Sequence, residues 1–424
     1  MPDIGPLPDA VETPPLAGMV DPYAVLRNRD LALYLIGRFV ASLGQQMLTV
    51  AVGWELYERT GSTLALGLVG LTQMVPMILF TLPAGHLADN HSRKRIIVLT
   101  TFVIACASLG LTFISWFGAN VFWIYFCLFV AGTARTFLWP ASSAFLPHLV
   151  SRQDFSRAVT WSSGSFQLSS VAGPAAGGAL IALTHHAAPV YAVNSAAALL
   201  CLTLIGFVRR YHATPAKEKM TFVSLIAGFK FVFLNQIILG TITLDLFAVL
   251  LGGATALLPV YAKDILRAGP TGLGILQAAL PLGSLVCALV LAHRAPLQRA
   301  GRTLLWAVAG FGLATIGFGF SRWFWVSFGL LFICGVTDNV SVVVRHTLVQ
   351  LLTPDEKRGR VSAVNSLFIG TSNELGGFES GFVAYLAGSP VFSVVSGGIG
   401  TILVVLAVAI IWPQIRKVGR LDAT

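Results

Sequence analysis

The chain has 424 residues, of which 55% are hydrophobic and only 11% are charged, and its mean hydropathy is +0.78. A soluble domain carries about 25% charged residues, so this composition excludes a soluble protein with an ordinary polar surface. Long apolar runs recur along the whole chain, which predicts an all-α polytopic membrane protein.

The first segment, residues 1–29, is rich in proline and has no basic stretch followed by an apolar run, so we expect a disordered cytoplasmic arm without a cleaved signal peptide. Twelve transmembrane spans are predicted after it. They cover 30–57, 62–88, 95–117, 121–149, 154–183, 188–209, 236–262, 270–293, 303–320, 323–351, 359–387 and 389–412.

These spans form two halves of six. The predicted organisation is an N-terminal six-helix bundle at 30–209, a cytoplasmic linker at 210–235, a C-terminal six-helix bundle at 236–412 and a cytoplasmic tail at 413–424. Within the linker, residues 221–234 carry apolar side chains at helical spacing, which predicts an amphipathic helix lying on the membrane surface.

The two halves show a weak internal repeat. A shift of 205 residues places Gly67 on Gly272 and Pro76 on Pro281. Repeats of this kind build transporters whose binding site lies near the bilayer midplane, between the halves.

The distribution of charge predicts the orientation. If the N-terminus is cytoplasmic, 21 of the 28 Lys and Arg residues fall on the cytoplasmic side, 4 on the opposite side and 3 within spans. This is the positive-inside pattern, and it places both termini in the cytoplasm. It also accounts for the net charge of +10, so binding of nucleic acid is not needed to explain it.

The five cysteines predict neither disulfides nor a metal site, because all lie in apolar runs and no C-x-x-C or His/Cys cluster occurs. No G-x-x-x-x-G-K-[ST] sequence occurs either, so we expect neither ATP hydrolysis nor an enzyme. No cofactor is expected.

A charged turn between the second and third spans contains Gly85, Asp89, Arg93, Lys94 and Arg95. The cations alone would serve as a topology signal. The aspartate is not needed for that, so we interpret the turn as a gating element. In that interpretation Asp89 pairs with a nearby cation or helix N-terminus and holds the cytoplasmic side closed.

The fifth span contains Gly173, Pro174, Gly177 and Gly178. Glycines four residues apart allow close helix approach, and proline kinks a helix. From these residues alone, the stretch predicts close packing of a kinked helix against its neighbours, without any role in the direction of transport.

Charges within membrane spans are costly and are functional candidates by default. Arg135 lies near the middle of the fourth span, while Asp338 and Arg345 lie seven residues apart on one face of the tenth. Asp338 is therefore either a functional carboxylate or a structural partner for Arg345 or Arg135.

Arg38 and Asp245 occupy equivalent depths in the first and seventh spans and have opposite charges. We expect these two residues to pair across the interface of the halves. For Arg38 and Arg345 the alternative is that the side chain reaches the cytoplasmic surface.

Glu374 lies halfway along the eleventh span without a cation in that span, so it is a candidate for reversible protonation or substrate contact. The amides of Gln45, Gln46 and Asn373 lie at similar depth. They are expected either to line the cavity or to form hydrogen bonds between helices.

The turn G-x-L-A-D-x-x-x-R-K-R and the sequence G-P-x-x-G-G resemble two motifs of the major facilitator superfamily, the second being typical of its exporters. Other stretches resemble the branch that contains the enterobactin exporter and macrolide efflux proteins. They are 137–141 with 146–147, 225–229 and 359–364. One departure is the equivalent turn at 290–300, which keeps cations but lacks the aspartate.

The resemblance implies twelve helices in two pseudo-symmetric six-helix bundles, alternating access and proton-driven export. We therefore expect a monomer in the bacterial inner membrane that exports a small amphipathic, siderophore- or drug-like molecule by proton antiport. Spans 1, 4, 5, 7, 10 and 11 are expected to line its cavity. The alternatives are a lipid or lysophospholipid translocator, an importer or uniporter of a polar metabolite, and a non-transporting scaffold or sensor.

Overall fold

The computed structural model describes residues 23–209, 230–294 and 298–419, apart from the side chains at 82, 89, 355, 356 and 363. The helices of the first half are α1 (Arg29–Thr60), α2 (Thr63–Asn90), α3 (Arg93–Trp116), α4 (Val121–Phe145), α5 (Phe155–Thr184) and α6 (Ala188–Gly206). Those of the second half are α8 (Gln236–Leu251), α9 (Leu258–Val260), α10 (Gly269–Ala292), α11 (Ala300–Phe320), α12 (Phe324–Leu352), α13 (Asp355–Ala387) and α14 (Pro390–Ile411).

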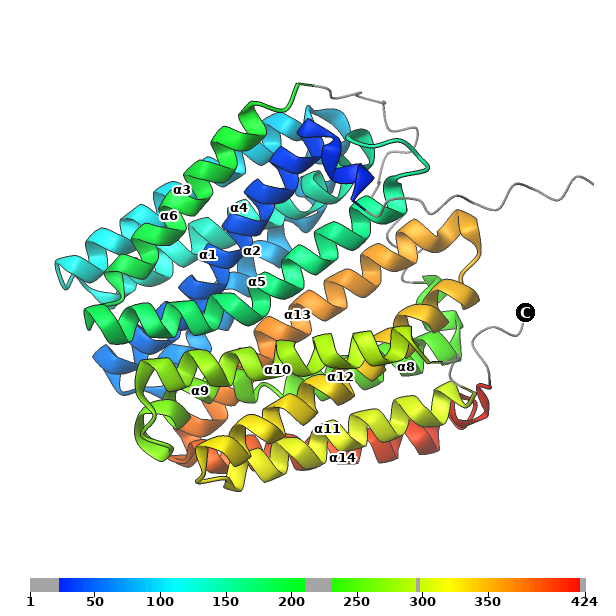
Figure 1. Cartoon of the computed structure of the whole chain (residues 1–424). Coiled ribbons are helices and arrows are strands. Elements are labelled where there is room, and N and C mark those ends of the chain that lie inside the picture. The colour runs from blue at the N-terminus through cyan, green and yellow to red at the C-terminus, as the bar shows by residue number, and fades with distance from the viewer. Residues whose placement is uncertain (1–22, 210–229, 295–297, 420–424) are drawn as a thin grey trace, which may run out of the picture.

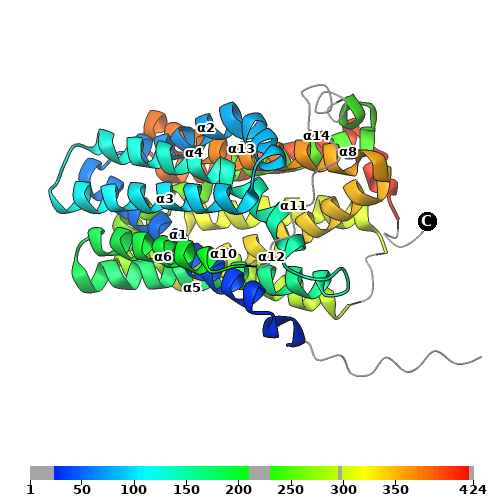
Figure 2. The same ribbon diagram turned by 90° about the horizontal axis from the view of Figure 1, so that it is seen from above.

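The predicted all-α membrane architecture is confirmed. Helices α1–α6 pack into one bundle and α8–α14 into a second, and the two bundles lie side by side in Figure 1; in Figure 2, which is the view from above, their helices overlap. In the described part of the chain, eleven helical segments are long and apolar enough to cross a membrane. The eleventh predicted span corresponds to α13, which has 33 residues but is less apolar and is not among the eleven.

The predicted seventh span is not one continuous helix. Helix α8 ends at Leu251, and the chain continues through η3 (Ala254–Leu257), α9 and the π-helical turn η4 (Tyr261–Ile265). Two adjacent glycines, Gly252 and Gly253, have low helix propensity and occupy the break. A methyl group at Gly253 would overlap the backbone carbonyl of Gly376, so α13 packs directly against the interrupted segment.

Among the described residues, the two bundles share an apolar core at one end and not at the other. We call the end with the shared core the distal end; α1 finishes there at Thr60 and α10 begins there at Gly269. A single cluster of buried residues at that end includes Leu56 and Tyr57 of the first bundle and Leu257 and Leu273 of the second. At the proximal end, the clusters around Phe145 and around Leu304 each belong to one bundle.

Glycines allow the bundles to touch at the distal end. A methyl group at Gly178 of α5 would overlap the carbonyl of Pro270, and one at Gly274 of α10 would overlap the carbonyl of Pro174. On the other side of the molecule, Gly67 of α2 and Gly381 of α13 meet backbone to backbone. The bundles therefore meet along two glycine-lined seams, α5 with α10 and α2 with α13.

Several sequence predictions fall wholly or partly outside the described residues. They concern residues 1–22, the tail from 420, and the linker helix at 221–234, of which residues 230–234 are described and helical. Within the predicted arm, η1 (Ala24–Arg27) buries Val25, and the Asn28 amide donates to the Leu149 carbonyl at 2.8 Å.

We predict that Gly274→Ala destabilises the protein, because the added methyl group forces α5 and α10 apart. Overpacking of this kind costs about 1–3 kcal/mol. The measurement is thermal unfolding of the purified protein in detergent. Gly329→Ala is the matched control, because Gly329 also lies in a membrane helix and has no neighbouring atom within 4 Å of the added carbon. Equal melting temperatures for the two variants would contradict the seam.

Candidate functional site

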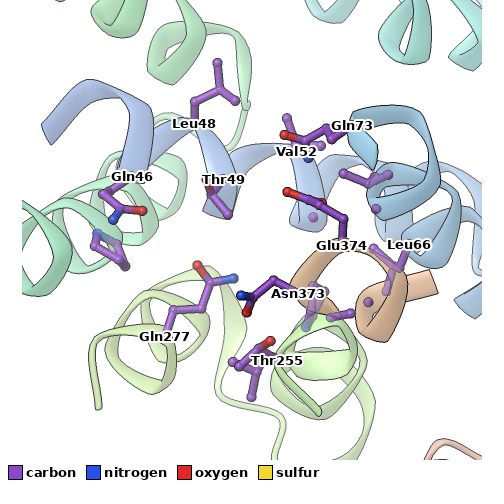
Figure 3. Close-up of a pocket in the computed structure, with 18 of the residues that line it drawn as sticks. Gln46, Leu48, Thr49, Val52, Leu66, Gln73, Thr255, Gln277, Asn373 and Glu374 are labelled. Carbon is purple, nitrogen blue, oxygen red and sulfur yellow. The ribbon is translucent and has the colours of Figure 1, made fainter. Parts of the chain in front are cut away.

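A cavity of about 410 Å³ lies between the two bundles (Figure 3). Its walls come from α1, α2, α4 and α5 of the first bundle and from the interrupted segment after α8, α10, α12 and α13 of the second. All six of the spans expected to line it contribute, and the second and eighth spans contribute as well.

The cavity wall is rich in uncharged polar groups and holds two charged residues. The uncharged polar residues are Gln45, Gln46, Thr49, Gln73, Ser170, Thr255, Gln277 and Asn373. The charged residues are Arg135 and Glu374. An apolar wall with a few convergent polar groups is the usual character of a small-molecule site, and here the amides make hydrogen bonding the main source of orientation.

Arg135 of α4 is held at the wall by the side-chain amide of Gln73, whose oxygen accepts from the guanidinium. Glu374 of α13 attracts Arg135 electrostatically, although the two described residues form no direct ion pair. The Nε atom of Arg135 is buried and has no hydrogen-bond partner among the described residues. The guanidinium therefore carries one buried donor whose desolvation is not offset by a hydrogen bond from the described residues.

Glu374 and Asn373 bring the second bundle to the cavity from consecutive positions of α13. Figure 3 shows the side chains of Asn373 and Gln277 pointing toward one another, while Glu374 points toward α1 and Gln73. The backbone of Glu374 is fixed by the α2 seam, because a methyl group at Gly70 would overlap its carbonyl oxygen. Closing or opening this seam would therefore move the carboxylate.

The glycines of the predicted exporter motif pack α5 against α1 of its own bundle and against α10 of the other bundle. Added methyl groups at Gly173 and Gly177 would collide with Gln46 and Met47 of α1, while Gly178 faces α10 across the seam. Next to it, the Gln46 amide donates to Ser170 Oγ at 3.0 Å, which is the interhelical bond given above as one alternative for this amide. Gln46 nevertheless also lines the cavity.

The predicted pairing of Arg38 with Asp245 is wrong. Asp245 forms an ion pair with Arg345 of α12, and both side chains are almost fully buried inside the second bundle. Arg38 lies in the first bundle, near enough to Tyr34 and Cys201 to act on both electrostatically. The prediction was wrong because it paired residues that lie at equal depth in the membrane and did not weigh partners within the same bundle.

Burial also excludes the alternative in which the Arg345 side chain reaches the cytoplasmic surface, since Arg345 is only 2% exposed. Asp338 forms no ion pair with Arg345 or Arg135, all three being described residues, and it is not part of the cavity wall. Of the predicted charged residues, only Arg135 and Glu374 line the described cavity. The predicted amides of Gln45, Gln46 and Asn373 line it as well.

The charged turn at 85–95 lies at the proximal end, and Gly85 is in the last turns of α2. Arg93 is buried and donates to the Ala144 carbonyl at 3.2 Å and to the His148 ring, so it ties α3 to the end of α4. Arg95 is exposed. The side chain of Asp89 lies outside the described residues, so the gating role of this turn stays a prediction.

Sequence reasoning missed Gln73, Thr255 and Gln277 because isolated polar residues in apolar runs look alike whether or not they face a cavity. It also missed a polar contact at the distal end. There the Tyr57 hydroxyl of α1 donates to the Asp264 carboxylate of η4, and the Lys263 ammonium lies 5.6 Å from the centre of the Tyr57 ring. This contact joins the two bundles.

We predict that the buried Asp245–Arg345 pair is costly to break but not to replace. Arg345→Met leaves a buried carboxylate unpaired, which costs about 3–5 kcal/mol. Asp245→Leu combined with Arg345→Met removes both charges and should recover most of that loss. Thermal unfolding of the three proteins checks this prediction. A double variant no more stable than the single one would contradict it.

Comparison with known proteins agrees with this architecture. Residues 34–377 match the family model described as Major Facilitator Superfamily. The chain is 25% identical over 383 residues to the enterobactin exporter EntS of Salmonella choleraesuis (strain SC-B67), covering 90% of this chain and 92% of that one. EntS of Escherichia coli O1:K1 / APEC is also 25% identical, with 90% and 91% covered.

Among solved structures, the nucleoside transporter NupG superposes with a TM-score of 0.73 at 11% identity, covering 90% of this chain and 100% of that one. The inward-facing, occupied structure of a bacterial homologue of the lysosomal transporter Spinster gives 0.70 at 12% identity, covering 92% and 97%. These likenesses support the fold. Together with the family match, they show that this chain is a multi-pass membrane transport protein and belongs to the Major Facilitator Superfamily.

Proposed function

We propose that this protein exports a small amphipathic organic molecule across the bacterial inner membrane, by alternating access coupled to proton entry. The single observation that carries this proposal is the cavity between the bundles, whose wall sets one carboxylate opposite one guanidinium among hydrogen-bonding amides. The relation to enterobactin exporters and the G-P-x-x-G-G sequence support the outward direction.

The conformation fits one state of such a cycle. With the N-terminus in the cytoplasm, as the charge distribution predicts, the distal end is periplasmic, and the two bundles share a core there. At the proximal end each bundle keeps a core of its own. This arrangement corresponds to a state closed toward the periplasm. Export then requires the distal contacts to open while the bundles close at the cytoplasmic end.

Proton coupling is assigned to Glu374. When this carboxylate is charged, it attracts Arg135 toward the cavity and favours the arrangement that binds substrate; when it takes up a proton, that attraction is lost and substrate binding is weakened. Because Glu374 belongs to α13 and Arg135 to α4, protonation changes the attraction between the two bundles. Proton uptake and substrate binding would then compete for the same pair of residues.

The substrate class follows from the wall. Aliphatic side chains such as Leu48, Val52 and Leu276 suit an apolar body, while the amides and Arg135 suit hydroxyl, carbonyl or carboxylate groups. The polar groups of the cavity wall would equally accept a polar metabolite that moves inward. The direction of movement in a vesicle assay separates the two functions.

We expect inverted membrane vesicles with an acidic interior to accumulate substrate only while the pH gradient lasts. The probes are a panel of siderophores, macrolides, dyes and lysophospholipids, first screened by thermal stabilisation of the purified protein. Accumulation that persists after the gradient is collapsed by an uncoupler would rule out proton antiport. Uptake into right-side-out vesicles alone would favour the importer.

Glu374→Gln should reduce gradient-driven accumulation at least tenfold and leave substrate-induced thermal stabilisation in place, because the amide keeps its volume but carries no exchangeable charge. Glu379→Gln is the matched control: it lies in the same helix but outside the cavity wall. If Glu374→Gln transports at the rate of the control, Glu374 is not the coupling residue.

Asp264→Asn should shift the population toward states open to the periplasm, because it weakens the hydrogen bond that the Tyr57 hydroxyl of the first bundle donates to residue 264 of the second. The measurement is the distance between spin labels at Phe117 and Arg322, which are exposed near the distal ends of the two bundles. Glu58→Gln, a nearby exposed carboxylate, is the control. An unchanged distance distribution in Asp264→Asn would show that this contact does not hold the distal end closed.

A further inference from the structure

A basic pocket lies at the proximal end of the second bundle, away from the central cavity. It has a volume of about 570 Å³ and is lined by Arg299, Arg302, Pro413, Arg416, Lys417, Val418 and Gly419. All four cations are exposed, and none forms an ion pair with another residue of the described chain. No carboxylate belongs to the described wall, so the pocket attracts anions.

Tertiary contacts hold the C-terminal residues of the pocket against the start of α11. The backbone N–H groups of Ala300 and Gly301 donate to the carbonyls of Gly419 and Val418, at 3.1 and 3.3 Å. Ile415 of η5 (Ile415–Lys417) is fully buried, and its carbonyl lies so close to Gly301 that a methyl group there would overlap it. These contacts fix the cations of the C-terminal segment beside those at the start of α11.

An apolar wall begins one turn deeper in the membrane. Trp306 follows Arg302 by four residues on the same face of α11, and its side chain is 77% exposed. The adjacent helix α14 exposes Ile410 in the same way, at 72%. An exposed tryptophan between cations and aliphatic side chains marks the level of the lipid headgroups.

We propose that this pocket binds the headgroup phosphate of an anionic phospholipid, whose acyl chains lie along Trp306 and the exposed face of α14. Basic pockets beside membrane helices on the cytoplasmic side recognise such headgroups. A free phosphate ion would use the cations but not the apolar wall. A zwitterionic lipid would use the wall but would bring no net charge to the four cations.

The test uses purified full-length protein in neutral detergent, with bound lipid counted by native mass spectrometry. Phosphatidylglycerol should bind at least tenfold more tightly than phosphatidylcholine. Arg302→Gln combined with Lys417→Gln should weaken phosphatidylglycerol binding at least fivefold and keep the Arg416 bond to the Ala409 carbonyl that caps α14. Inorganic phosphate in large molar excess over the lipid should not displace it, because a free phosphate ion gains nothing from the apolar wall.

The matched control is Arg29→Gln combined with Arg152→Gln, which removes two exposed cations elsewhere on the predicted cytoplasmic side. It should stay within twofold of the wild type. Lys417→Glu alone is a second test of the basic pocket, because it reverses one exposed charge and breaks no hydrogen bond of the described chain. Equal binding of both lipids, displacement by phosphate, or an equal loss in the control would overturn the proposal.

Discussion

Close backbone contact between the bundles at the distal end is the constraint on which the rest of the structure depends. The seams of α5 with α10 and of α2 with α13 are possible only because Gly178, Gly274, Gly67 and Gly381 present no side chain there. In a membrane such contacts supply dispersion energy that lipid would otherwise supply, since no hydrophobic driving force acts between helices. In the proposed transport cycle they are the contacts that break and reform.

The cavity follows from those seams. The glycine motif of α5 contacts α1 on one side and α10 on the other, and Pro174 lies between them in the cavity wall. The α2–α13 seam places the carbonyl of Glu374 against Gly70. The position of the proposed coupling carboxylate is therefore set by the same packing that closes the distal end. In the proposed cycle, this packing connects protonation of Glu374 to opening of the distal end.

Much of the fold could be predicted from the sequence, because a bilayer imposes long apolar runs whose ends are marked by charge. The break after Leu251 was missed because Gly252 and Gly253 lie inside an apolar run, where glycine is common in membrane helices and does not by itself signal an interruption. Of the site, Arg135 and Glu374 were predicted because charge in a span is expensive. Amides such as Gln277 carry no comparable signal, and pairing between helices, as for Asp245 and Arg345, depends on helix rotation that spacing does not determine.

The account places proton and substrate in competition at one cavity, with Glu374 facing Arg135. The most direct test is proton release from the purified protein in weak buffer when a substrate identified by thermal stabilisation is added, followed with a pH-sensitive dye. The account predicts proton release by the wild type and none by Glu374→Gln, although that variant still binds the substrate. Binding without proton release by the wild type, or equal release by both proteins, would contradict it.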